Sequence, residues 1–143
     1  MPDPRAMATA IRTALGLLST TAAKGAPANT VIDLGPLIQA WSVGSYAVGD
    51  VRMHNGYPWR CCQAHSSAGN PGWSPGAVVA LWAPYHATDV AHALPWVKPT
   101  GAQDAYQVGE CVIWTDGKVF RCKITGCVYS PTEYTAGWEV VYD

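Results

Sequence analysis

Residues 51–61 read VRMHNGYPWRC, and the Asn-Gly pair at residues 55–56 predicts a β-hairpin in this stretch. Asn-Gly is a favoured pair for a two-residue turn, because both turn residues take positive φ angles. The segments on either side, VRMH and YPWRC, are β-prone and partly alternating. Residues 111–122, CVIWTDGKVFRC, repeat this arrangement around the Asp-Gly pair at residues 116–117. The chain therefore contains two predicted hairpins of the same design.

The hairpins belong to a longer internal repeat, which runs from residue 41 to 82 and again from residue 95 to 138. Corresponding positions are Trp41 and Trp96, Tyr46 and Tyr106, Asp50 and Glu110, Arg60 and Arg121, Trp73 and Tyr129, and Trp82 and Trp138. We expect a mainly β fold, in which an N-terminal helix is followed by two small three-stranded antiparallel β modules. The modules are predicted at residues 39–86 and 95–143. Each is expected to bury its leading Trp, its Tyr and its closing Trp in a small core.

The segment before the repeat predicts a helix over residues 4–23, within an N-terminal region that ends at residue 24. Pro4 suits the first turn of a helix, and Asp3 can cap it. A 4-3-4 spacing, typical of one apolar seam, joins Met7, Ile11, Ala14 and Leu18. The seam is expected to pack on the protein's own body or in an assembly with other chains. Residues 25–38, punctuated by Gly and Pro, predict a linker.

Composition excludes several classes of partner. Charged residues make up 13% of the 143 residues, and the formal net charge is -1. No basic patch is available to neutralise phosphates, so we expect no nucleic-acid partner. No apolar run approaches the roughly 18 residues that a membrane span needs, and Arg12 interrupts a stretch that otherwise resembles a secretory signal. Seven Trp and seven Tyr suit surfaces that are partly apolar and partly wet.

The five cysteines cannot all pair within one chain. Adjacent residues such as Cys61 and Cys62 rarely suit a disulfide or a tetrahedral metal site. If residues 116–117 are the two turn residues of the second hairpin, Cys111 faces Cys122, a register that allows a cross-strand disulfide. The disulfide state of Cys111, Cys122 and Cys127 stays open at this stage. Cys61 and Cys122 are expected to be small buried hydrophobes.

Motifs for catalysis are missing from the sequence. The histidines share no metal-ligand spacing, and there is no His-Glu-x-x-His, Cys-x-x-Cys, P-loop or Gly-x-Ser-x-Gly. Asp50 and Glu110 each precede a predicted strand, where a carboxylate commonly caps backbone N–H groups. We therefore expect a protein that is not an enzyme and needs no cofactor or metal.

The first copy resembles a chitin-binding type 3 module, which is carbohydrate-binding module family 5/12. The resemblance rests on a leading Trp, a Tyr-x-x-Gly-Asp-x-Val-like segment, the Asn-Gly hairpin, an aromatic-Arg-Cys strand, Gln-x-His, Gly-Trp-x-Pro and a closing Leu-Trp. These motifs stand at Trp41, YAVGDV, residues 55–56, Trp59-Arg60-Cys61, Gln63-Ala64-His65, Gly72-Trp73-Ser74-Pro75 and Leu81-Trp82. The resemblance implies polysaccharide binding without catalysis.

The second copy is more divergent. Its opening, PWVKPTGAQDAYQVGE, and its ending, SPTEYTAGW, resemble repeats in tailed-phage structural proteins. A short helix ahead of such modules also resembles that group. The resemblance implies a place on the surface of a virion, such as a tail fibre, tail tip or capsid spike. Its implied partners are host-surface glycans, other virion proteins contacted through the helix, and further copies of the chain.

Four residues are expected to contact carbohydrate: Trp73, Tyr129, His65 and Tyr57. The resemblance implies that the Trp of the Gly-Trp-x-Pro loop is exposed and stacks on a sugar ring, whereas the closing Trp is buried. An indole offers a flat apolar face to the C–H groups of a pyranose. Alternatively, Trp73 covers its own small core, and His65 orders its own loop. Two other functions stay open: a structural decoration or fibre protein whose aromatics pack on neighbouring subunits, and a secreted chitin-binding protein.

Overall fold

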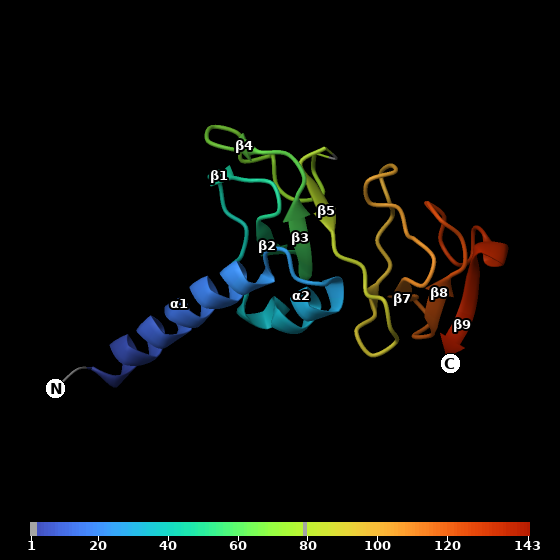
Figure 1. The fold of residues 1–143 in the computed structure, drawn as a ribbon, viewed down its shortest axis with the longest axis horizontal. Helices are drawn as coiled ribbons and strands as arrows, with labels where there is room; N and C mark the ends of the chain where they lie inside the picture. The colour runs from blue at the N-terminus through green and yellow to red at the C-terminus, as the bar shows by residue number, and fades with distance from the viewer. Residues whose placement is uncertain (1–2, 79) are drawn as a thin grey trace.

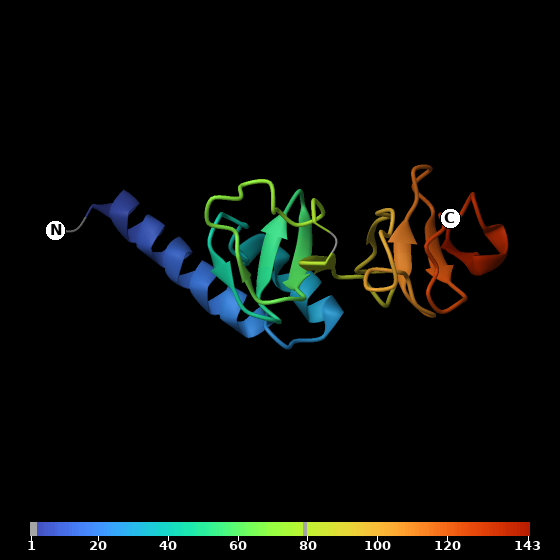
Figure 2. The same cartoon turned by 90° about the horizontal axis from the view of Figure 1, so that it is seen from above.

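The computed structural model describes residues 3–78 and 80–143. A long N-terminal helix projects from one end of the molecule, and a β unit at the other end contains the C-terminus (Figure 1). A second β unit lies between them, and both views show a slender connection between the two units (Figures 1 and 2). The structure confirms a mainly β chain in which a helix precedes several small sheets.

Helix α1 covers Pro4–Ala23, as the sequence predicts. The Asp3 carboxylate accepts a hydrogen bond from Arg5 N at 2.9 Å and caps the helix. Pro4 occupies the first turn, where its missing N–H leaves no hydrogen bond unmade. The predicted boundaries therefore follow from two residues with strong positional preferences.

The last turns of α1 pack on the first β unit. Ser19, Thr20 and Ala23 are buried, and the Thr20 hydroxyl accepts a hydrogen bond from Gln39 N at 2.9 Å. These contacts use the small and polar side of the helix. They anchor its C-terminal end and leave its N-terminal turns extending away from the β unit (Figure 1).

The apolar seam of α1 does not pack on the protein's own body. Met7, Ile11 and Leu18 are 51%, 58% and 68% exposed, and Ala14 is also exposed. At 100° per residue, this seam lies on the side of the helix opposite Ala23. One of the two alternatives for the seam, packing within the chain, is therefore wrong.

Residues 25–38 differ from the predicted linker. They form helix α2, Ala28–Leu34, and the short 3-10 helix η1, Gly35–Leu37. Val31 is fully buried in a cluster that also contains Ala23, Ile38 and Val51. The Gly and Pro residues in this segment mark the ends of short helices, and the apolar residues between them fill a core.

In the described part of the first β unit, the strands form two small sheets. Its strands are β1 (Ser45–Tyr46), β2 (Val51–His54), β3 (Tyr57–Cys61), β4 (His65–Ser66) and β5 (Trp82–Pro84). Strands β2, β3 and β5 form a three-stranded antiparallel sheet, and β1 pairs with β4. Asn55 and Gly56 have φ angles of 51° and 77°, as a two-residue turn requires. The first hairpin is confirmed in this register, with His54 opposite Tyr57.

The second β unit contains one four-stranded sheet, where the sequence predicts three strands. Its strands are β6 (Leu94–Pro95), β7 (Cys111–Ile113), β8 (Val119–Cys122) and β9 (Trp138–Tyr142), and the 3-10 helix η2 (Thr135–Gly137) precedes β9. Strand β6 adds to the edge of the sheet and runs parallel to β7. The first unit has the same feature in reduced form, an isolated parallel bridge between Ala40 and Met53.

The predicted register of the second hairpin is wrong by one residue. Cys111 pairs with Arg121, and the turn is closed by a hydrogen bond from Trp114 N to Lys118 O at 2.9 Å. Three residues therefore form the loop, with Gly117 at a φ of 85°. A three-residue loop that ends in a left-handed glycine shifts the register relative to a two-residue turn. All five cysteines are free thiols.

Each β unit has its own aromatic core. Tyr46 and Trp82 meet edge to face at 5.0 Å in the first, and Tyr106 and Trp138 meet at 5.4 Å in the second. Trp82 and Trp138 are 2% and 4% exposed, which confirms the predicted burial. The leading residues Trp41 and Trp96 are partly buried at the edges of these cores.

Residues 85–93 connect the two units through specific polar contacts. On the first unit, Asn29 of α2 accepts a hydrogen bond from Thr88 N at 2.9 Å, and Asp33 of α2 contacts His92 Nε2 at 2.9 Å. On the second unit, Cys111 N donates to Ala87 O at 2.9 Å. The connection is therefore held to both units.

Candidate functional site

The loop that presents Trp73 is built from consecutive tight turns. Asn70 N donates to Ser67 O at 2.8 Å, Trp73 N to Asn70 O at 3.1 Å, and Ala77 N to Ser74 O at 3.0 Å. The loop begins at Ser67, which is fully buried and exchanges hydrogen bonds with the backbone of Gly44. Prolines at positions 71 and 75 stiffen the turns further.

Trp73 is 37% exposed, so the residue is accessible to solvent, as predicted. A large apolar surface on a pre-formed loop loses little conformational entropy when a ligand stacks on it. The structure thus gives Trp73 the exposure and the rigid support that a stacking residue needs.

His65 lies against the core of the first unit and orders the chain around itself. Its Nδ1 donates to Gln63 O at 2.7 Å, and its ring meets the Trp82 ring edge to face at 5.9 Å. Its Nε2 is buried, and among the described residues it has no hydrogen-bond partner. The geometry supports the loop-ordering alternative for His65.

Tyr57 is a buried residue and is not exposed as a flat binding platform. It is 7% exposed, and its hydroxyl donates to Pro95 O at the start of the second unit. Burial raises the pKa of Tyr57 strongly. The tyrosine joins the two units, and it also lines a neighbouring cleft.

This cleft lies beside the Trp73 loop and has a volume of about 430 Å³. Its walls include His54, Asn55, Tyr57, Trp59, Ser74 and Val97. They come from the first hairpin, from the residues directly after Trp73, and from the segment that follows β6. Apolar walls with a few polar groups are typical of small-ligand sites.

In the second unit, Tyr129 has a companion that the sequence reasoning did not identify. Tyr129 is 52% exposed, as expected, and stacks with Tyr134, which is 42% exposed, at 6.1 Å between ring centroids. The Trp138 indole donates to Tyr129 O at 3.0 Å, so the buried tryptophan holds the backbone beneath the exposed ring. The Ser-Pro-Thr-Glu turn between the two tyrosines was the only sequence signal that they would meet.

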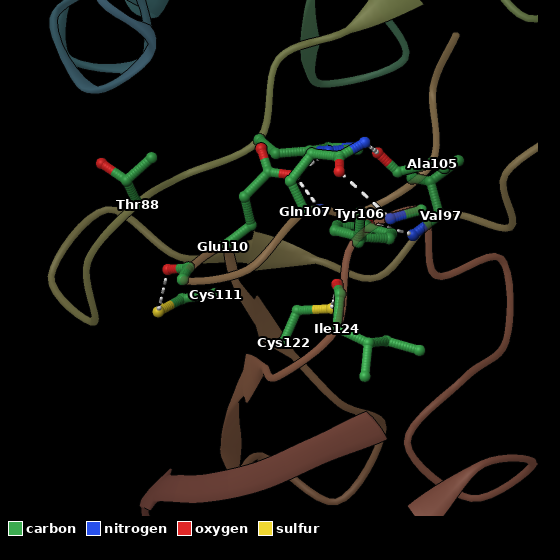
Figure 3. A network of polar contacts seen from close by, with 12 residues as sticks. Thr88, Val97, Ala105, Tyr106, Gln107, Glu110, Cys111, Cys122 and Ile124 are labelled. Atoms are coloured by element: carbon green, nitrogen blue, oxygen red, sulfur yellow. Dashed lines mark hydrogen bonds and ion pairs between the residues drawn. The ribbon is translucent and has the colours of Figure 1, made fainter. Parts of the chain in front are cut away.

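Asp50 and Glu110 occupy corresponding positions in the two copies, and each caps a turn in its own copy, as predicted. Asp50 accepts a hydrogen bond from Ala47 N at 2.8 Å, and Glu110 accepts one from Gln107 N at 2.6 Å (Figure 3). Burial alone raises the pKa of Asp50, but the Ala47 amide and the Lys24 ammonium outweigh it and lower the pKa below its usual range. Both carboxylates are thus structural groups.

Each turn carboxylate also receives a basic side chain from the preceding segment. Lys24 Nζ lies 2.9 Å from Asp50, and His86 Nδ1 lies 3.2 Å from Glu110. The His86 ring stacks on Tyr106 at 3.8 Å. In both copies, the segment that precedes the unit therefore contacts the turn carboxylate through a basic side chain. The sequence repeat did not predict this contact.

Within residues 3–78 and 80–143, no group of three or more His, Cys, Asp or Glu side chains could hold a metal ion. No helix in the same part of the chain has the length and hydropathy to cross a membrane.

Comparison with known proteins finds a similarity for the first unit. Residues 40–83 match the family model of carbohydrate-binding module family 5/12. The matched stretch contains the hairpin, the Trp73 loop and the closing Trp82. The first unit is therefore similar to a carbohydrate-binding module, and the match ends before the second copy begins.

A curated relative shares part of the sequence. Streptogrisin-C of Streptomyces griseus is 38% identical to the chain over 72 residues, which make up 48% of the chain and 15% of that protein. The chain thus spans only a small part of the length of this relative. The match does not include the rest of Streptogrisin-C.

Proposed function

We propose that this protein binds polysaccharide without catalysing a reaction, and that Trp73 is the principal contact. The observation that carries the proposal is the exposed indole on a stiff loop, inside the stretch that matches the carbohydrate-binding family. Tyr129 and Tyr134 form a second aromatic platform on the other unit. The turn-capping roles of Asp50 and Glu110 leave neither as a free catalytic carboxylate.

The proposed setting is the surface of a phage particle, where the tandem units adsorb to host-surface glycans from a tail fibre, a tail tip or a capsid spike. Support comes from the resemblance of the second copy to repeats of tailed-phage structural proteins. The exposed seam of α1 offers a means of attachment to other virion proteins or to further copies of the chain. A secreted chitin-binding protein would use the same Trp73 platform.

Retention on insoluble polysaccharide tests the binding function. Purified protein is incubated with chitin, with cellulose and with isolated bacterial cell walls, and the bound fraction is measured. Trp73→Ala is expected to weaken binding by about 5- to 150-fold, the range measured when stacking aromatics are removed from nucleic-acid sites. Tyr142→Ala is the matched control, because Tyr142 is 63% exposed on the last strand. Equal retention of both variants would remove the case for Trp73.

A second function, assembly through α1, is favoured by the arrangement of its two faces. The chain packs the small, polar side of the helix on its own body and turns Met7, Ile11, Ala14 and Leu18 outward. A 4-3-4 apolar spacing is that of helices that associate side by side. A helix of this length is marginal alone in water, so a partner on the seam stabilises it. In this alternative, the exposed aromatics pack on neighbouring subunits.

The molecular mass in solution tests this assembly. Size-exclusion chromatography with light scattering is expected to show an oligomer for the native chain and a monomer for Ile11→Lys. Thr13→Lys carries the same added charge on an exposed position away from the seam and is expected to keep the native mass. A monomeric native chain would leave attachment to a different protein as the use of the seam.

A further inference from the structure

The cleft beside the Trp73 loop extends the proposed carbohydrate site, and this inference rests on the proposed function. We infer that the cleft is a subsite for a neutral sugar ring, next to the ring that stacks on Trp73, and that the second β unit completes it. The cleft measures about 430 Å³. That volume lies within the range of pockets that hold small ligands.

The lining of the cleft fits the chemistry of a sugar. Tyr57, Trp59 and Val97 supply apolar surface. Among the described residues, the imidazole of His54, the amide of Asn55 and the hydroxyl of Ser74 have no hydrogen bond within the chain. Sugars present C–H groups on one face and hydroxyls at the rim, so a wall of this mixed kind can satisfy both.

The charge of the lining restricts the class of sugar. None of the described residues that line the cleft is Lys, Arg, Asp or Glu. Acidic polysaccharides are usually held by guanidinium or ammonium groups. A cleft that offers amide, hydroxyl and imidazole groups suits neutral glycans, and we expect binding to be insensitive to salt.

The cleft also sits directly beside the platform. Ser74 follows Trp73 in the same loop, and the turn from Ser74 to Ala77 forms part of the wall. In this proposal, a linear glycan that lies on Trp73 continues past Ser74 into the cleft with its next rings.

Val97 is the contribution of the second unit, and it is fixed from both sides. Its N–H donates to the Tyr106 hydroxyl at 3.1 Å (Figure 3), while its side chain packs against the core of the first unit. Two residues earlier, Pro95 O accepts the hydrogen bond from Tyr57. The wall is thus formed before ligand arrives, which lowers the entropic cost of binding.

Filling the cleft tests the subsite. Ala77 is exposed and lines the cleft, so Ala77→Trp is expected to block it while the fold is kept. Calorimetry is done with neutral disaccharides and linear hexasaccharides of N-acetylglucosamine, glucose and mannose. For the native chain, the hexasaccharide that binds is expected to bind more tightly than its disaccharide. Ala77→Trp is expected to remove that gain and to raise the hexasaccharide Kd about tenfold or more. Ala68→Trp, at an exposed position earlier in the loop, is the matched control.

A second variant removes polar groups without adding bulk. Asn55→Gly keeps a residue that accepts positive φ, and Ser74→Ala deletes one hydroxyl. The double variant is expected to raise the hexasaccharide Kd by about two- to twelvefold per lost hydrogen bond. If both variants bind as the native chain does while Trp73→Ala binds weakly, the subsite is overturned and the proposed function stands. Absence of binding to every saccharide overturns both.

Discussion

The same indole side chain serves two different purposes at Trp73 and Trp82. Trp73 stands on a loop of consecutive turns and meets solvent, whereas Trp82 on β5 is 2% exposed against Tyr46 and His65. Nine positions separate them in the sequence. The difference arises from the backbone beneath each residue, because prolines and glycines hold one outward and a strand turns the other into the core.

Replacing each of these tryptophans with alanine should separate binding from stability. Trp82→Ala removes a buried side chain from a small core and is expected to cost about 3–5 kcal/mol of unfolding free energy. Trp73→Ala is expected to change stability by no more than about 0.5 kcal/mol. Urea denaturation followed by circular dichroism checks both. A large loss of stability in Trp73→Ala would show that its ring mainly covers the core.

Cys122 provides a test of burial at a single atom. Burial, as the largest cause, and the neighbouring Cys127 together raise the pKa of the Cys122 thiol to about 11. Only the thiolate reacts quickly with alkylating reagents. At pH 8 we therefore expect no alkylation of Cys122 by iodoacetamide in the native chain and rapid alkylation in urea. Peptide mass spectrometry measures both, and rapid native modification would place this thiol at the surface.

At the scale of elements, residues 25–38 were expected to form a linker, but they contain helix α2, which packs into a core. The side chain of Val31 is fully buried between α1 and the first sheet. Short helices of this kind are stabilised mainly by packing. The segment therefore fixes the direction in which α1 leaves the β unit.

Val31→Ala tests whether α2 is an integral element. Loss of two buried methyl groups is expected to cost about 2 kcal/mol of unfolding free energy. Thr30→Ala changes an exposed neighbour in the same helix and is expected to have an effect within about 0.5 kcal/mol. Thermal denaturation distinguishes them. Equal stability of the two variants would mean that residues 25–38 do behave as a linker.

The connection between the units should respond to pH through His92. Hydrogen bonds to Asp33 and then to Asp89 raise the pKa of His92, and its charged form bridges the two carboxylates. Because the pKa of His92 is higher in the folded chain than in the unfolded chain, the contact is fully stabilised at pH values below the unfolded pKa of about 6.5. This stabilisation is lost as the pH rises through the folded pKa. We expect amide protection factors in residues 86–93 to fall over this window. His92→Gln should remove the pH dependence.

The predictable parts of this fold are those specified locally. Asp3 and Pro4 set the start of α1, and the Asn-Gly turn sets the first hairpin. The register of the second hairpin was predicted wrongly because Asp-Gly occurs in both two-residue and three-residue loops. In the structure, Gly117 has a positive φ at the end of a three-residue loop, and this sets the register. Residues 25–38 were predicted to be a linker because their Gly and Pro residues are evident in the sequence. The burial of Val31 depends on tertiary contacts, which the sequence pattern does not show.

In the candidate site, too, the features that depend on local sequence could be predicted and those that depend on distant contacts could not. The exposure of Trp73 and Tyr129 could be inferred from their loops and their place in the repeat. The roles of Tyr57, Tyr134 and Val97 could not, because each depends on a partner distant in sequence or on a turn not yet formed. Tyr57 meets Pro95 across 38 positions of sequence. Sites assembled between repeats are beyond what the pattern of one repeat specifies.

At the scale of the whole molecule, α1 divides into an anchored and a free part. Met7 and Ile11 are exposed, whereas Ala23 is fully buried and Lys24 pairs with Asp50. Deletion of residues 1–14 is therefore expected to leave the melting temperature unchanged and to abolish assembly. Deletion of residues 1–24 should lower the melting temperature as well, because it removes Ala23 from the core. Differential scanning calorimetry and light scattering check both truncations. A fully stable second truncation would show that α1 is independent of the β unit.

The docking of residues 86–94 on the second unit has a consequence for its autonomy. A fragment cut at residue 95 would leave the Tyr106 ring without the stacked imidazole of His86 and Cys111 N without its acceptor at Ala87. Chains are synthesised from the N-terminus, and domains fold as they emerge. We therefore expect Asn29 and Asp33 of the earlier unit, which contact Thr88 and His92 in the folded chain, to hold this incoming segment when Cys111 and Tyr106 leave the ribosome. The first unit is then expected to assist the folding of the second, and exchanging the order of the two copies along the chain is expected to remove that help.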